Sequence, residues 1–225
     1  MDGRVRLVEK AAELLGQDTV PILTRLMKCD GGDWYLQEKI AGAPNHETLL
    51  DNTRPLKYAA CFVDNGATVA FVRETSTQTP DLRVEVGLRT FYVEVRKFRM
   101  GLGDAPLHPA SKIVDAVQRK RSQLPRGEIG FVAIDNFDLR LEPGFRHSLI
   151  AEGLREIGRM AASNPNGWRR PSGVIVSAAS NVSSGPGWVD FPHFIWRNQH
   201  GECPPPDQLV KWLVSSLPSG SVFEN

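Results

Sequence analysis

The sequence has little of what marks several common classes of protein. Its three cysteines, Cys29, Cys61 and Cys203, are widely spaced and form no Cys-x-x-Cys pair, so the sequence indicates neither a disulfide framework nor a thiolate zinc site. No apolar run approaches the roughly 20 residues that span a membrane, and the first residues lack the apolar core of a signal peptide. We therefore expect a cytoplasmic protein that does not enter a membrane.

Several catalytic motifs are also missing. The five histidines are scattered and lack the i, i+4 spacing of a zinc-binding helix. The chain contains neither a Gly-x-Ser-x-Gly nucleophile motif nor a Walker phosphate-binding loop. These absences argue against helix-borne zinc hydrolases, serine hydrolases of the nucleophile-elbow type and P-loop nucleotidases.

Two acidic residues stand in neighbouring segments that alternate between polar and apolar residues. Residues 81–86 place Asp81 on the polar face of one predicted strand, and residues 91–97 place Glu94 on the polar face of the next. The four residues between them are few enough for a hairpin connection. Because the two carboxylates are followed by the cation Arg96, this arrangement is typical of a site for a hard divalent metal.

The segments around these acids form a recognisable order. A helix and a strand are predicted before the hairpin, and a helix and a strand after it, at residues 56–66, 67–74, 111–124 and 130–134. With Pro80-Asp81 and Glu94-Val95-Arg96, this order resembles the PD-(D/E)XK nuclease superfamily over roughly residues 55–135. The resemblance implies a restriction-endonuclease-like α/β fold, with an αβββαβ core and a mixed central sheet flanked by helices.

The resemblance also implies a set of metal ligands. Asp81 and Glu94 match the two metal-binding acids of the family, and the carbonyl of Val95 matches a backbone ligand. Mg2+ or Mn2+ is the implied cofactor. A further acid is expected from an earlier element, and Glu74 and Glu47 are both candidates for it.

One position departs from the family pattern. The family usually has lysine two residues after the Glu, whereas this chain has Arg96 there, followed by Lys97. Arginine can hold a phosphate or a water molecule, but its pKa above about 12 prevents it from acting as a base. Lys97 has the required amine, but in a regular strand it points to the opposite face unless a bulge redirects it. Two functions remain open: a metal-dependent nuclease using Asp81, Glu94, Arg96 and Lys97, or a catalytically inactive nuclease-fold module that binds nucleic acid or a protein.

The net charge of +1 conceals a basic region. Residues 83–126 contain ten Lys or Arg against four Asp or Glu, next to the predicted metal site. This excess suits phosphate contacts, although a solvated helix face is the alternative. The candidates for nucleic-acid binding are Lys112, Arg119, Lys120 and Gln123, and the last two resemble a Lys-x-x-Gln pattern of some family members. We expect DNA in preference to RNA, with a homodimer or a partner subunit also possible.

The rest of the chain completes the domain. Residues 1–44 are predicted to form a helical N-terminal extension, and residues 45–225 the nuclease-like α/β domain. Beyond the core, helices are predicted near residues 145–162 and 208–216, and a buried strand at 173–177. Trp168-Arg169-Arg170 and Trp196-Arg197 combine aromatic rings with cations, which suits either base stacking or packing in the core.

Overall fold

The protein is built on a seven-stranded mixed sheet whose strands lie in sequence order. The computed structural model describes residues 3–74, 79–97, 109–135, 143–177, 193–217 and 222–224. β1 to β3 form an antiparallel meander, β3, β4 and β5 are parallel, β6 is antiparallel to β5, and β7 is parallel to β6. The strands are β1 (Thr68–Phe71), β2 (Leu82–Val86), β3 (Arg89–Lys97), β4 (Ile129–Asp135), β5 (Gly173–Ser177), β6 (His193–Arg197) and β7 (Val222–Glu224).

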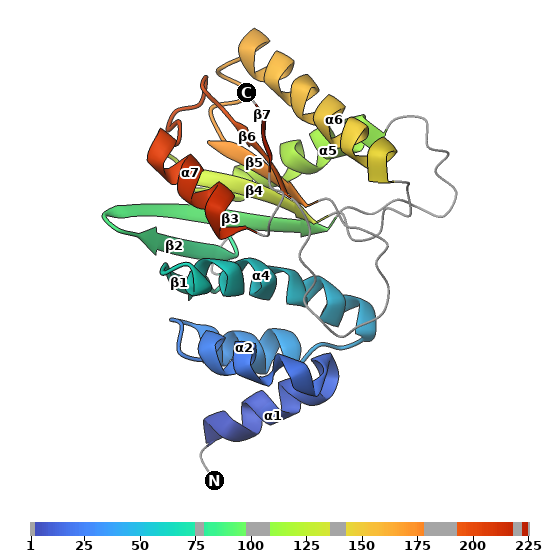
Figure 1. Cartoon of the computed structure of the whole chain (residues 1–225), viewed down its shortest axis with the longest axis vertical. Coiled ribbons are helices and arrows are strands. Elements are labelled where there is room, and N and C mark those ends of the chain that lie inside the picture. The colour runs from blue at the N-terminus through green and yellow to red at the C-terminus, as the bar shows by residue number, and fades with distance from the viewer. Residues whose placement is uncertain are drawn as a thin grey trace.

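Helices cover both faces of the sheet, and the N-terminal helices add a further layer outside α4 (Figure 1). α5 and α6 connect the parallel strands β3, β4 and β5, as crossover helices of a parallel sheet do. The helical segments are α1 (Gly3–Leu15), η1 (Gln17–Thr19), α2 (Val20–Leu26), α3 (Gly32–Trp34), the π-helical η2 (Tyr35–Ile40), α4 (His46–Asp64), α5 (Pro109–Lys120), η3 (Arg121–Gln123), α6 (Pro143–Ser163) and α7 (Asp207–Ser216).

Alternation along the strands divides the buried apolar residues between two cores. In β4, Phe131 and Ala133 belong to the core shared with α4 and α7, whereas Val132 and Ile134 belong to the core shared with α5 and α6. Both sets are fully buried. Strands buried on both faces read as continuous apolar runs, which is why the segment from Phe131 to Ile134 carries no polar residue.

The β2–β3 hairpin places the two acidic residues side by side. Val86 pairs with Arg89, so the connection is a two-residue turn, and Gly87 adopts the positive φ of 59° that such turns require. The register then pairs Leu82 with Val93. Since the strands are antiparallel, Asp81 lies next to Glu94 at one edge of the sheet.

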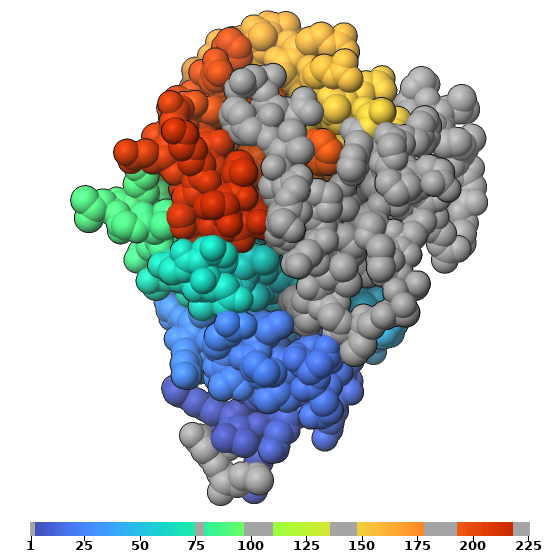
Figure 2. Space-filling view, in the orientation of Figure 1, coloured from blue at the N-terminus to red at the C-terminus, as the bar shows by residue number. Residues whose placement is uncertain are grey.

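α4 is the middle layer between the sheet and the N-terminal helices. Its first turn is capped by Asn45, whose Oδ1 accepts a hydrogen bond from the backbone N–H of Thr48 at 2.8 Å. Figure 2 shows α4 and α7 side by side on one face of the molecule, with the N-terminal helices on the other side of α4. The Asn65 amide at the end of α4 donates to the Ser216 carbonyl of α7 at 3.2 Å, and the Trp212 indole of α7 donates to the Asn65 carbonyl at 3.3 Å.

The predicted α/β class and mixed sheet flanked by helices are confirmed. The element order α4, β1, β2, β3, α5, β4 is helix, three strands, helix, strand. The helix predicted from residue 56 begins at His46, because the Asn45 cap, a local signal, starts it ten residues earlier. The division at residue 44 stays a prediction; residues of the N-terminal helices and of the sheet belong to one continuous core.

Candidate active site

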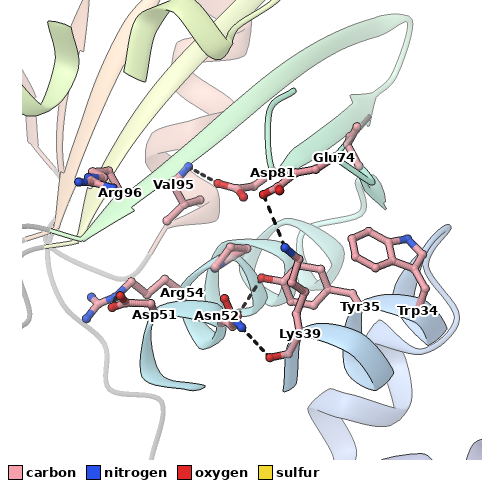
Figure 3. A pocket seen from close by; sticks show the side chains of 12 residues that line it. Trp34, Tyr35, Lys39, Asp51, Asn52, Arg54, Glu74, Asp81, Val95 and Arg96 are labelled. Carbon is pink, nitrogen blue, oxygen red and sulfur yellow. Dashed lines mark hydrogen bonds and ion pairs between the residues drawn. The ribbon is translucent and has the colours of Figure 1, made fainter. Parts of the chain in front are cut away.

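Asp81 is held against β3 by a backbone hydrogen bond. It directly precedes β2, and its Oδ2 accepts the N–H of Val95 at 2.7 Å (Figure 3). Its own carbonyl accepts the N–H of Val72, which extends the pairing beyond β1. The Asp81 carboxylate is therefore fixed beside β3 by the extended pairing of three strands rather than by a loose turn.

Glu94 projects from β3 toward α5 and meets Lys120. The Lys120 Nζ donates to the Glu94 Oε1 at 2.6 Å and to the Gln123 Oε1 at 2.7 Å. The Glu94 side chain is only 3% exposed and that of Lys120 20%. The Lys-x-x-Gln pair predicted to contact nucleic acid thus makes its hydrogen bonds at the second acid of the motif.

These side chains line one pocket at the edge of the sheet. Its walls are Glu74, Thr79, Asp81, Glu94, Val95, Lys120 and Gln123, and its volume is about 360 Å³. A second pocket adjoins it on the side of the N-terminal helices and shares Glu74, Asp81 and Val95 with it. In Figure 3 Lys39 reaches from η2 toward the shared acids, and its Nζ lies 3.5 Å from the Glu74 Oε1.

The pocket is short of positive charge. Burial, followed by the negative charge of Asp81, raises the pKa of Glu94 from its ordinary value to about 8, although Lys120 opposes this. Burial also raises the pKa of Asp81 to about 6, with the Val95 N–H acting in the opposite direction. Lys120 and Lys39 also oppose the rise at Asp81, but burial outweighs them, and a cation bound between the two carboxylates would favour the ionised form of both.

The donor set suits a hard cation. Asp81 and Glu94 provide carboxylate oxygens, and Val95, whose carbonyl would be a third oxygen donor, lines the same pocket. Water would complete such a shell around Mg2+. Within the described ranges, no group of three or more His, Cys, Asp or Glu side chains is placed to hold a metal ion. A metal ion bound here would therefore be held by two carboxylates and a backbone oxygen, not by three or more side chains.

The two candidates for the third acid differ in position. Glu74 lines the pocket with Asp81 and Glu94, although its side chain is 72% exposed. Glu47 lies exposed in the first turn of α4 and lines neither of the two pockets. Asp51, one turn further along α4, lines the adjoining pocket and was not among the predicted site residues. No motif in the sequence singles it out.

Of the two cations that follow Glu94, the structure describes the side chain of Arg96 alone. Arg96 lines the adjoining pocket, and Figure 3 shows its side chain directed away from Asp81. The backbone of Lys97 pairs with Asp135 in β4, but its side chain lies outside the described residues. Of the remaining basic candidates on α5, Lys112 is half-buried and Arg119 is exposed, and neither lines the pocket of Glu94.

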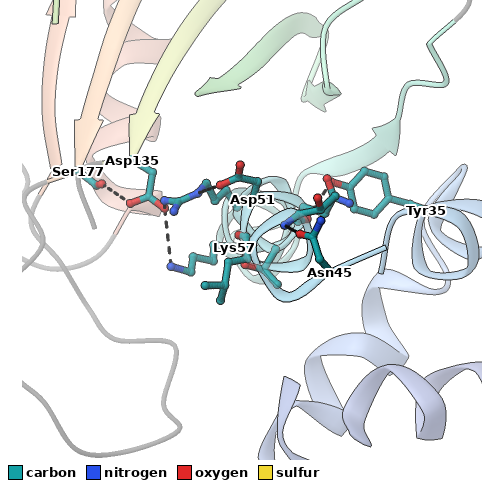
Figure 4. Close-up of polar contacts among 11 residues, drawn as sticks. Tyr35, Asn45, Asp51, Lys57, Asp135 and Ser177 are labelled. Carbon is teal, nitrogen blue, oxygen red and sulfur yellow. Dashed lines mark hydrogen bonds and ion pairs between the residues drawn. The ribbon is translucent and has the colours of Figure 1, made fainter. Parts of the chain in front are cut away.

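A second buried carboxylate lies at the carboxyl end of β4. The Asp135 Oδ2 receives the Arg54 Nη1 at 2.6 Å and has the Lys57 Nζ at 3.8 Å, while the Ser177 Oγ donates to its Oδ1 at 2.9 Å (Figure 4). Burial alone would raise the pKa of Asp135, but the positive charges of Lys57 and Arg54 lower this pKa below its ordinary value. No local sequence pattern indicates this cluster, since Arg54 and Asp135 are 81 residues apart.

The tryptophans of the two aromatic-cation motifs are part of the core. Trp168 and Trp196 are 3% and 4% exposed and both belong to the core under α5 and α6. Their rings therefore do not stack on bases, and the packing alternative for both motifs is the one observed.

Comparison of the chain with models of protein families, with curated proteins and with solved structures finds no match. Among the described residues, no helix has both the length and the apolar character needed to cross a membrane.

Proposed function

We propose that the chain is a metal-dependent nuclease of the PD-(D/E)XK type, which hydrolyses phosphodiester bonds in nucleic acid, DNA in preference to RNA. The observation that carries the proposal is the convergence of Asp81, Glu94 and Lys120 on one pocket. The element order from α4 to β4 supports it, because this is the order that the resemblance implies.

The acids of the pocket would hold the cofactor. Asp81, Glu94 and the carbonyl of Val95 are the groups that would bind Mg2+ or Mn2+, with Glu74 near enough to share in the site. Bound there, the cation would stabilise negative charge on the phosphoryl group and ease the loss of a proton from water.

Lys120 supplies the amine that the strand motif lacks. An ammonium group has three N–H donors, and two of those of Lys120 go to Glu94 and Gln123, which fix its position. The third is available to an oxygen of the phosphodiester or to the attacking water. In the hydrolysis the water oxygen bonds to phosphorus, the bond to the departing sugar oxygen breaks, and the proton lost by water is balanced by one gained by the departing oxygen.

A cleavage assay with matched variants tests the proposal. Single-stranded DNA, duplex DNA and RNA are each incubated with purified protein and Mg2+ or Mn2+, beside Asp81→Asn and Glu94→Gln, which keep side-chain volume while removing charge. Glu85→Gln is the control, because Glu85 lies on β2 but forms an exposed pair with Arg83. We expect cleavage by the parent and the control, loss in both site variants, and loss with EDTA.

Other outcomes would contradict the proposal. Cleavage that persists in both Asp81→Asn and Glu94→Gln would exclude this pocket as the site. If no substrate is cut but nucleic acid binds with an affinity that falls steeply with salt, the chain is the inactive binding module instead.

A further inference from the structure

A pocket lined by arginines lies beyond the end of α5. Arg121 and Arg126 come from the segment between α5 and β4, and Arg169 and Arg170 from the segment between α6 and β5. The pocket has a volume of about 410 Å³, and Glu202 is its one acidic lining residue. Two segments far apart in the sequence thus bring four positive charges to one hollow.

Two of the four guanidinium groups are fixed in place by uncharged partners. The Arg121 Nη1 donates to the Gly167 carbonyl, and the guanidinium carbon lies 4.8 Å from the ring centroid of the buried Trp168. The Arg170 Nη1 donates to the carbonyls of Leu124 and Ser122, the latter at 3.3 Å. Carbonyl groups and an aromatic ring orient a guanidinium but do not neutralise its charge.

The other two arginines stand at the rim. Arg126 and Arg169 are exposed, and the Arg169 Nη2 donates to the Asn166 Oδ1 at 3.0 Å. Across the part of the chain that the structure describes, none of the four arginines forms an ion pair with a carboxylate. A guanidinium has five N–H donors in a planar fork, so most of the donors in this pocket remain available to a ligand.

Bringing these arginines together in one pocket costs electrostatic free energy, because their positive charges repel one another. Burial, followed by the positive charge of Arg170, lowers the pKa of Arg121. Like charges at close range destabilise one another unless an anion lies between them. A ligand that suits this pocket is therefore anionic, and phosphate matches the guanidinium fork in charge and geometry.

We infer that the arginine pocket binds a backbone phosphate of the nucleic acid, at a position separate from the phosphodiester that is cut. The substrate class rests on the proposed function, but the pocket does not involve the two acids. Gln123 lines the pocket of Glu94, whereas Arg121 and Ser122 line the arginine pocket, so the short η3 segment borders both. A single strand of nucleic acid passing over η3 would engage both sites.

Binding in the absence of metal tests this inference. Fluorescence anisotropy with labelled single-stranded and duplex DNA is measured in EDTA between 50 and 200 mM KCl for the parent and for Arg126→Ala/Arg169→Ala. Both rim side chains are exposed, so the substitutions spare the anchored pair Arg121 and Arg170. We expect about tenfold weaker binding, and a plot of log K against log salt that is less steep by about one, because one phosphate contact is weakened.

Two further variants serve as controls. Arg6→Ala/Lys10→Ala removes the same charge from exposed positions on α1, outside both pockets, and should bind as the parent does. Arg126→Lys/Arg169→Lys keeps the charge and should keep the salt dependence.

The inference is overturned if the double alanine variant binds with the affinity and salt dependence of the parent, or if the α1 control loses as much. It is also overturned if the parent binds no nucleic acid in EDTA. Because cleavage is not measured, a failure of Asp81 and Glu94 to catalyse hydrolysis leaves these outcomes unchanged, and the two proposals can fail separately.

Discussion

The edge of the sheet carries two buried carboxylate centres that are compensated in opposite ways. Asp135 has two cations and a hydroxyl group around it, and its pKa is lowered. Glu94 has one ammonium group and a second acid nearby, and its pKa is raised. The negative charge of Asp135 is balanced by Arg54 and Lys57, and this contact joins α4 to β4. The charge of Glu94 is not balanced in this way, so a bound cation would stabilise its ionised form.

The neighbouring charge distinguishes the two centres better than burial does. The side chains of Glu94 and Asp135 are 3% and 5% exposed, so accessibility does not separate them. What separates them is the balance of neighbouring charge. A buried acid with too little positive charge costs stability, and such a cost is typical of sites that bind a metal or a substrate.

The largest expected effect tests the structural role of the Asp135 centre. Arg54→Met removes the cation closest to Asp135 and leaves a buried carboxylate beside Lys57 alone. We expect a loss of about 3–5 kcal/mol in the free energy of unfolding, measured by urea denaturation. Adding Asp135→Asn should restore part of this loss. If the single variant loses less than about 1 kcal/mol, Asp135 is not held by Arg54 and the comparison fails.

The next effect tests the catalytic role proposed for the Glu94 centre. Lys120→Met removes the ammonium group beside Glu94 while keeping a long side chain. We expect the cleavage rate to fall by about 10²–10³-fold, as when one stabilising donor is removed from an active site. The control is Lys211→Met, which changes an exposed lysine on α7. Equal rates for the two variants would remove Lys120 from the mechanism.

The pH dependence of stability should differ between the two centres. The folded protein keeps the proton of Glu94 to a higher pH than the unfolded chain does, so this group stabilises the fold at low pH and loses that contribution as pH rises from about 4 to about 8. Asp135 acts oppositely: its contribution is present above about pH 4 and is lost as the pH falls further.

Urea denaturation in EDTA at pH 5 and pH 8 checks the Glu94 contribution. The parent should lose on the order of 1–2 kcal/mol more than Glu94→Gln does between these values. Identical losses would mean that the Glu94 carboxylate titrates alike in the folded and the unfolded protein.

The smallest effect is expected at an exposed ion pair on the same hairpin. Arg83 pairs with Glu85, and both side chains are more than 40% exposed. Arg83→Met should change the free energy of unfolding by less than about 1 kcal/mol, because solvent and salt screen exposed pairs. A loss as large as that of Arg54→Met would show that exposure does not decide the strength of these pairs.

Local patterns predicted more of the fold than of the site. Alternation and turn residues located β2 and β3, and with them the adjacency of Asp81 and Glu94. The partner of Glu94 could not be predicted in this way, because Lys120 reaches it from α5, 26 residues later. The Arg54–Asp135 pair could not be predicted from the sequence either, because only the packing of α4 on the sheet brings these two residues together.

The position of α4 has a consequence for how the chain folds. Leu23, Leu26, Leu36 and Ile40 of the N-terminal helices are fully buried in the same core as Leu56 and Phe62 of α4. A fragment that starts after these helices would expose this apolar surface to water, at a cost of about 25 cal/mol for each Å². The N-terminal helices and the sheet should therefore melt in one transition, and the stability of the Glu94 pocket includes the burial of residues that do not line it.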